Sequence, residues 1–244
     1  HSLFDYFMRE WAGVDPATGL GLYNLYYNDV NDNGIFDSGD QAITNYTNFL
    51  NDNPDANIKK TVTDNSSQAT QKFVGKSAIP KVRGAFRINA SYRNFDLTTQ
   101  FGYSFGGYAY DNGYASLMQT GDQIGANNYH VDMRDRWQQP GDITNVPRLS
   151  AGYATEDTYS SATSTRFLIK SDYIAFNNAR LGYTLAKSYT DRMGLSKLNL
   201  YISGDNLAIF SARKGFNPQT FTSSSGIGGY IPMTTVSIGA KVEF

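Results

Sequence analysis

One pattern limits the fold of this chain more than any other: apolar and polar residues alternate strictly at its C-terminal end. The apolar positions are Val236, Ile238, Ala240, Val242 and Phe244, and small or polar residues separate them. Successive side chains of a β-strand point to opposite faces, so a period of two predicts a strand with one apolar face and one polar face. We therefore expect the chain to end in such a strand.

The same period of two occurs in earlier stretches. They cover residues 82–92, 95–105, 173–186 and 197–210. Asn94 lies between the first two and predicts a tight return, so we expect those two to form a hairpin. Residues 192–196 join the last two briefly. Less regular strands are expected at residues 3–12 and 20–28, joined by a Pro- and Gly-containing turn at residues 15–19.

The composition agrees with an all-β chain. It contains 18 Tyr, 15 Phe and 23 Gly, and only 18% of its residues are charged. Aromatic residues favour pleated strands over helices. The net charge is −1 with scattered Lys and Arg, so no basic stripe is available for a nucleic-acid backbone, and nucleic acid is excluded as a partner. The absence of Cys excludes disulfides, thiolate metal sites and a cysteine nucleophile.

The spacing of the strands distinguishes a membrane barrel from a soluble fold. No run of about 18 apolar residues occurs, so a transmembrane helix is excluded, whereas a barrel wall needs only alternate apolar residues. Long segments rich in Gly, Ser, Thr, Asn and Tyr cover residues 29–79, 106–166 and 211–229, and short turns join the other strand ends. Short periplasmic turns and longer extracellular loops are typical of outer-membrane barrels.

The number of strands indicates only part of a barrel. About seven strands would close only a small barrel of about eight strands, and the loops are too long for that. We therefore expect a segment of a larger antiparallel transmembrane β-barrel. His1 is neither an initiator Met nor part of an apolar signal, so we expect a processed or truncated chain. Aromatic residues near strand ends, such as Tyr92, Phe105 and Tyr183, suit interfacial girdles, with ordinary β-core packing as the alternative.

A series of short motifs resembles the last third of SusC/RagA-like TonB-dependent transporters. The motifs occur in the family's order over nearly the whole chain, and they are Asp5-Tyr6, Arg9-Glu10, Ala12 to Gly19, Gly75 with Pro80, Phe95-Asp96-Leu97, Phe105-Gly106-Gly107, Arg136-Trp137, Pro140-Gly141-Asp142, Pro147-Arg148, Asp172-Tyr173-Ile174, Leu181 to Leu185, Ser203 to Leu207, Phe210, Gly215-Phe216 and Phe244. One departure is Asn217-Pro218-Gln219, because such proteins often carry a carboxylate on either side of this proline.

The resemblance implies a location, an architecture and a set of partners. Residues 1–244 would be the C-terminal part of a barrel of about 22 strands in the bacterial outer membrane. The plug domain, the N-terminal strands and the TonB-contacting segment would lie outside this chain. A SusD-like surface lipoprotein would cap the barrel and hold an oligosaccharide or a peptide, and the resemblance leaves open which of the two is imported. This chain would supply wall, lumen lining and external loops.

An Asp- and Asn-rich stretch predicts a calcium site. Oxygen-bearing side chains fall at positions one, three, five, nine and twelve of a loop, with Gly34 at six and a backbone carbonyl at seven, as in EF-hand loops. The expected ligands are Asp29, Asn31, Asn33, Ile35, Asp37 and Asp40. Asp40 is shorter than the usual Glu, which weakens bidentate closure. A surface turn rich in Asn, Asp and Gly is the alternative, and any bound Ca²⁺ would stiffen the loop.

Two groups of residues are candidates for contact with substrate. The first is a set of aromatic side chains in the loop after residue 106, whose rings can stack on sugars or peptide side chains: Tyr108, Tyr110, Tyr114 and Trp137. The second consists of Arg83 and Arg87, on the polar side of a predicted strand. Packing of the aromatic loop against the barrel or the lipoprotein, and contact of the arginines with the plug, are the alternatives.

Catalysis is not expected. The only histidines are His1 and His130, and neither lies in a nucleophile-elbow motif. The loop carboxylates Asp132 and Asp135 have no sequence feature that marks them as a glycosidase pair. A secreted hydrolase is therefore disfavoured. A soluble surface glycan-binding or adhesin β-protein remains the main alternative to a transporter, and the apolar stripes of the strands argue against it.

Overall fold

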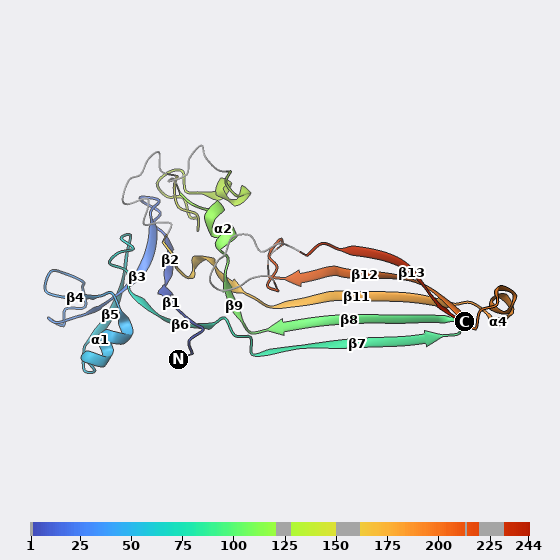
Figure 1. The fold of residues 1–244 in the computed structure, drawn as a ribbon. Helices are drawn as coiled ribbons and strands as arrows, with labels where there is room; N and C mark the ends of the chain where they lie inside the picture. The colour runs from blue at the N-terminus through green and yellow to red at the C-terminus, as the bar shows by residue number, and fades with distance from the viewer. Residues whose placement is uncertain (1, 121–127, 150–161, 213, 220–231) are drawn as a thin grey trace. The chain divides into compact units, whose positions relative to one another are not determined.

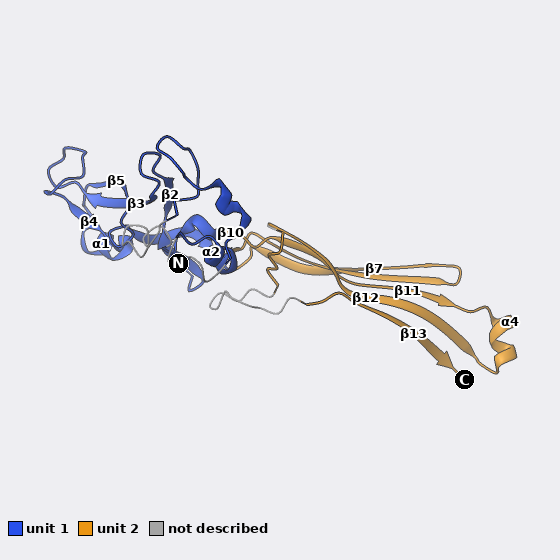
Figure 2. Ribbon diagram, turned by 90° about the horizontal axis from the view of Figure 1, so that it is seen from above, with its two compact units in different colours: residues 1–78, 110–168 blue, residues 79–109, 169–244 orange. Residues whose placement is uncertain are grey.

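A computed structural model describes residues 2–120, 128–149, 162–212, 214–219 and 232–244 (Figure 1). The chain divides into two compact units (Figure 2). Unit 1 comprises residues 1–78 and 110–168, and unit 2 comprises residues 79–109 and 169–244. In the described residues no helix is long and apolar enough to cross a membrane.

Unit 2 is built on a five-stranded antiparallel sheet. Its order is β13-β12-β11-β8-β7, and Figure 1 shows these strands running side by side. The strands are β7 (Val82–Tyr92), β8 (Phe95–Phe105), β11 (Tyr173–Thr184), β12 (Lys197–Ser211) and β13 (Thr235–Glu243). The predicted antiparallel β-architecture is confirmed, and the described residues form no closed barrel.

The hairpin of β7 and β8 follows the predicted boundaries. Val82 pairs with Phe105 and Tyr92 pairs with Phe95, so the strands are in continuous register. The two residues between them make the turn, and Arg93 has a φ of 53°. Tight two-residue hairpin turns need this left-handed backbone conformation. The turn therefore fixes the register of both strands.

One face of the five-stranded sheet consists of exposed apolar side chains. Phe86 is 48% exposed, Leu181 45% and Ile238 86%. The rings of Phe86, Phe101 and Phe176 stack across three strands, with centroid distances of 5.0 and 4.7 Å between successive rings. Cross-strand aromatic pairs of this kind stabilise a sheet from its own face. Within the described residues of unit 2, these aromatic rings therefore stack on one another, and no second layer of the unit packs on this face.

Unit 1 contains two small sheets. In the first, β1 (Asp5–Arg9) pairs with β6 (Gln71–Ser77). In the second, β3 (Gly21–Asn28) pairs with the three other strands, which are β2 (Trp11–Val14), β4 (Gln41–Ile43) and β5 (Ile58–Thr63). Alternate residues of β3 are buried, and Tyr23, Leu25 and Tyr27 are at most 2% exposed. These side chains form the core under the second sheet.

Short helices and one further strand pair complete the fold. The helices are α1 (Tyr46–Asp52), α2 (Asn112–Leu117), α4 (Lys187–Thr190), η1 (Val131–Asp135), η2 (Thr165–Phe167) and η3 (Asp191–Met193). Strand β9 (Tyr108–Tyr110) pairs with β10 (Leu168–Lys170). In unit 1, Met118, Met133 and Phe167 form a small buried cluster.

The segments expected to be loops contain more structure than their sequences indicate. Residues 29–79 include β4, α1, β5 and β6, and the Asn45 side chain caps α1 by accepting from the Asn48 backbone N–H. β11 ends at Thr184, two residues earlier than expected, and α4 and η3 precede β12. The expectation of plain loops was wrong here because elements of three to seven residues are too short to show a clear period.

Candidate functional site

The polar face of the five-stranded sheet carries a connected network of side chains. Arg180 forms an ion pair with Asp96, and its Nη2 donates to Asn199 Oδ1 at 2.6 Å. Asn199 Nδ2 in turn donates to Asp96 Oδ1 at 2.9 Å and to Thr184 Oγ1 at 3.0 Å. The Arg180 guanidinium lies 4.4 Å from the ring centroid of Tyr201. The network links β8, β11 and β12 on one face.

Two glycines make room for this network. A Cβ on Gly182 would lie 2.5 Å from the Asp96 carboxylate, and a Cβ on Gly239 would lie 2.4 Å from the ring of Tyr201. Each glycine lies directly across from the side chain that covers it, since Gly182 pairs with Asp96 and Gly239 with Tyr201. Large polar side chains therefore lie flat along the polar face.

The predicted arginines lie on this same face of unit 2. Arg83 and Arg87 belong to β7 and are exposed. Arg87 Nη2 donates to Gln100 Oε1 on β8 at 3.1 Å. Their expected position on the polar side of a strand agrees with the alternation, whereas contact with substrate stays a prediction.

The predicted aromatic residues do not form one group. In unit 1, Tyr110 and Tyr114 pack edge-on against Phe167, and the Tyr114 hydroxyl donates to Asp132 Oδ2 at 2.6 Å. Trp137, also in unit 1, has different contacts. Its Nε1 donates to the Pro16 carbonyl at 2.9 Å, and its ring covers Gly19 so closely that a Cβ there would lie 2.5 Å away. Tyr108 lies in β9 and belongs to unit 2. Their role in binding stays a prediction.

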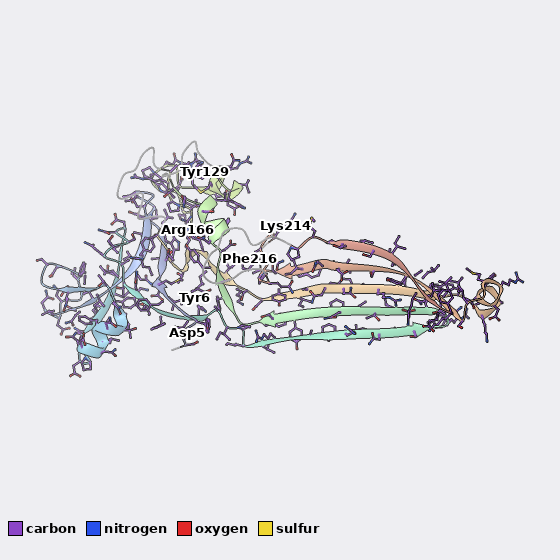
Figure 3. All side chains as sticks on the ribbon, in the orientation of Figure 1. Asp5, Tyr6, Tyr129, Arg166, Lys214 and Phe216 are labelled. Atoms are coloured by element: carbon purple, nitrogen blue, oxygen red, sulfur yellow. The ribbon has the colours of Figure 1, made fainter. Side chains whose placement is uncertain are left out.

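Arg166 is a half-buried cation that the sequence does not single out (Figure 3). Its guanidinium lies 4.9 Å from the Trp11 ring centroid and 4.7 Å from that of Phe167. Among the described residues its Nη1 has no hydrogen-bond partner. Burial lowers the pKa of Arg166 to about 10, and burial also raises the pKa of nearby Tyr23. The sequence around Arg166 contains no motif that would mark it as a functional residue.

The predicted calcium loop folds as a series of side chain to backbone turns. Asp29 is buried, and its two carboxylate oxygens accept from the N–H groups of Asn33 at 3.2 Å and Gly34 at 2.9 Å. Asn31 Oδ1 also accepts from the Asn33 N–H, and Asn33 Oδ1 accepts from the Ile35 N–H at 2.7 Å. Asn, Asp and Gly favour such turns whether or not an ion is bound.

The distal part of the loop is held through Asp37 and Asp40. Asp37 accepts from the side-chain amide nitrogens of Asn33 at 2.8 Å and Asn31 at 3.2 Å. Asp40 accepts from the Val30 N–H at 3.1 Å. The described residues contain no group of three or more His, Cys, Asp or Glu side chains placed to hold a metal. Amide oxygens such as those of Asn31 and Asn33 are also ligands for Ca²⁺, so calcium binding by this loop stays a prediction.

This sequence is similar to those of known TonB-dependent receptors. No family model matches it. Two TonB-dependent receptors of Formosa agariphila are similar to it: receptor P3 is 27% identical over 189 residues, and receptor P39 is 25% identical over 191 residues. These alignments cover 73% and 74% of this chain but only 18% of each relative. The chain thus spans less than a fifth of the length of these relatives.

Solved structures show the same fold. A RagAB peptide transporter matches with a TM-score of 0.67 and 20% identity, covering 97% of this chain and 22% of that one. A RagAB peptide importer in the open-open state matches with a TM-score of 0.65 and 21% identity, covering 98% and 22%. TonB-dependent receptors and RagAB are outer-membrane proteins, so the predicted location is confirmed. The predicted resemblance is confirmed as well: the chain is similar to TonB-dependent receptors and has the fold of part of a RagAB transporter.

Proposed function

We propose that this chain forms part of the barrel wall and the external loops of a TonB-dependent transporter that imports oligosaccharides or peptides across the outer membrane. The observation that carries the proposal is the five-stranded sheet of unit 2. One face presents exposed apolar residues such as Phe86, Leu181 and Ile238, and the other holds the Asp96–Arg180 network. A barrel wall needs an apolar face toward lipid and a polar face toward the lumen.

The edges of the sheet support a larger barrel. Among the described residues, β7 and β13 each pair with a neighbour on one side only. Unpaired backbone N–H and C=O groups are not tolerated in contact with lipid. Strands outside this chain would pair with both edges, and the plug would lie within the completed barrel. The residues that contact TonB would belong to the plug.

Partners and ligands follow from the same proposal. The likeness to RagAB supports a surface lipoprotein of the SusD or RagB kind as a partner. We propose Arg83 and Arg87 for the lumen side of the path, and Tyr108, Tyr110, Tyr114 and Trp137 for the loops that meet substrate or lipoprotein. The relatives are named as receptors and transporters, which fits a role without catalysis.

Uptake by cells tests this function. The full-length gene should be deleted and restored in its own host, and labelled oligosaccharide and peptide pools should be supplied. We expect uptake of one pool to fall to background on deletion and to require TonB. Extraction of washed membranes distinguishes a transporter from the main alternative. A soluble adhesin is released from the membranes by salt, whereas a barrel is released only by detergent. Release by salt together with unchanged uptake would exclude a transporter.

A further inference from the structure

A small cavity in unit 2 is lined by both polar and apolar residues, the apolar ones being Leu207, Ala208, Ile209 and Pro232. Its volume is about 220 Å³, and the polar side chains that line it are Asn177, Asn206, Asn217, Gln219 and Thr234. None of the described residues that line it carries a charge. The Asn177 amide has no hydrogen-bond partner among the described residues. The cavity therefore presents uncharged hydrogen-bonding groups beside apolar side chains, and among these groups Asn206 Nδ2 already donates to the Met233 carbonyl at 3.3 Å.

Irregular backbone occurs at two of the lining residues, Asn177 and Asn206. The register of β11 shifts between Phe176 and Asn178 against both of its neighbours, so Asn177 is an extra residue. Asn206 has a φ of 52°, in the left-handed region, and lies within β12 where that strand has its own extra residues. Bulges re-aim side chains and occur often beside functional sites. Both irregular positions belong to the lining of the cavity.

One residue that lines the cavity, Asn177, lies on the polar side of the sheet. A Cβ on Gly102 would lie 2.9 Å from Asn177 Nδ2. Gly102 is two residues from Gln100, whose side chain is bonded to Arg87 on the polar face. Asn177 thus lies on the polar face, which is the lumen side under the proposed function. A ligand moving along the lumen would pass this point of the wall.

We infer that this cavity is a subsite for one uncharged sugar unit of a transported oligosaccharide. An amide side chain both donates and accepts hydrogen bonds, and a sugar hydroxyl does the same. An acidic sugar or a charged peptide side chain would enter without a counter-charge, which is unfavourable in a partly closed space. A neutral stretch of peptide offers one backbone N–H and one backbone C=O per residue, on alternating sides of the chain. This arrangement suits pairing with a strand edge better than binding to a cluster of side-chain amides.

The residues around Pro218 agree with a neutral ligand. Asn217 and Gln219 lie on either side of this proline, both are uncharged, and both line the cavity. Gln219 is held by its backbone N–H, which donates to Asn217 Oδ1 at 3.0 Å. The two neutral residues would set the ligand class. This inference rests on the proposed function and names the substrate class within it.

Placing an acid at each of these two positions tests the inference. The double variant Asn217→Asp, Gln219→Glu changes charge with almost no change in shape. The full-length receptor, purified with its lipoprotein, is equilibrated with three pools: neutral hexose oligosaccharides, polygalacturonate oligosaccharides and tryptic peptides. Bound members are identified by mass spectrometry. We expect the native protein to retain neutral oligosaccharides and the variant to bind them about tenfold or more weakly, because a carboxylate cannot donate a hydrogen bond and each substitution therefore removes the donors of one amide.

A matched control separates charge from position. The variant Asn48→Asp, Gln68→Glu makes the same two changes at exposed residues of unit 1 and should bind like the native protein. Asn177→Ala should also weaken binding, without adding a charge. Unchanged binding in the first variant and in Asn177→Ala would overturn the subsite, and retention of peptides alone would overturn the ligand class. A native receptor that retains none of the three pools would contradict the proposed function itself.

Discussion

At the scale of single residues, the calcium loop gives a direct prediction. Replacing Asp29 and Asn31 with Ala removes two oxygen donors from a site with few acidic groups, so affinity for Ca²⁺ should fall by at least about tenfold. Isothermal titration of the full-length receptor with CaCl₂ measures this. Asp55→Ala, an exposed change outside the loop, should leave the affinity unchanged. Equal titration curves for the native protein and the double variant would show that the loop is only a turn.

The stabilisation of the same loop by ionised Asp37 should depend on pH. The Gly39 N–H, followed by the amides of Asn33 and Asn31, holds the pKa of Asp37 below its usual range. A lowered pKa in the folded state means that this contribution is present above the ordinary Asp pKa of about 3.9 and is lost as pH falls through the lower, folded value. The loop should therefore keep its order in mildly acidic solution.

Several of the important residues could not be chosen from the sequence, for physical reasons. Asn177 and Asn206 lie at bulges, and a period of two carries no sign of where an extra residue enters a strand. Arg166 is half-buried by aromatic residues distant in sequence, such as Trp11. The oxygens of Asp29 to Asp40, in contrast, were apparent because their spacing is local. What is local in the chain was predictable, and what depends on tertiary pairing was not.

At the scale of elements, the long strands were predictable because their pattern is continuous. β7 begins at Val82 and ends at Tyr92, as expected, since eleven alternating residues and a turn at Asn94 leave no competing register. β4 has three residues and α1 has seven, and both depend on contacts that the sequence does not show, such as the pairing of Tyr26 with Ile43. The length of an element thus decided whether it could be predicted from the sequence.

The face assignment of β13 predicts that a charge is costly at one position of the strand and tolerated at another. Val242→Arg places a cation on the apolar face and should cost up to about 2–4 kcal/mol if it lies near mid-membrane, and less near an interface. Ser237→Arg places the same cation on the polar face and should be tolerated. The folded fraction in outer membranes, measured by heat-modifiable gel mobility of the full-length protein, compares the two. Equal loss in both variants would contradict the assignment of faces.

At the scale of the whole molecule, the central claim is that the apolar face of the unit 2 sheet meets lipid. The chain spans 18% of its curated relatives, so the completed barrel depends on strands outside it. Within the chain, the claim depends on a single-layered sheet whose apolar residues, Ile202 and Val236 among them, remain exposed. An amphipathic wall of this kind is stable only when something apolar covers that face.

Accessibility of single spin labels along β12 tests this most directly. The chain contains no Cys, so one Cys at a time can be placed at Leu200, Tyr201, Ile202 or Ser203 and labelled in the full-length protein in bilayers, after replacing any cysteine elsewhere. We predict that labels at Leu200 and Ile202 collide mainly with dissolved oxygen in lipid, and that labels at Tyr201 and Ser203 do not. Water-soluble nickel chelate reaching Leu200 and Ile202 as readily as a free surface site would contradict a lipid-facing wall.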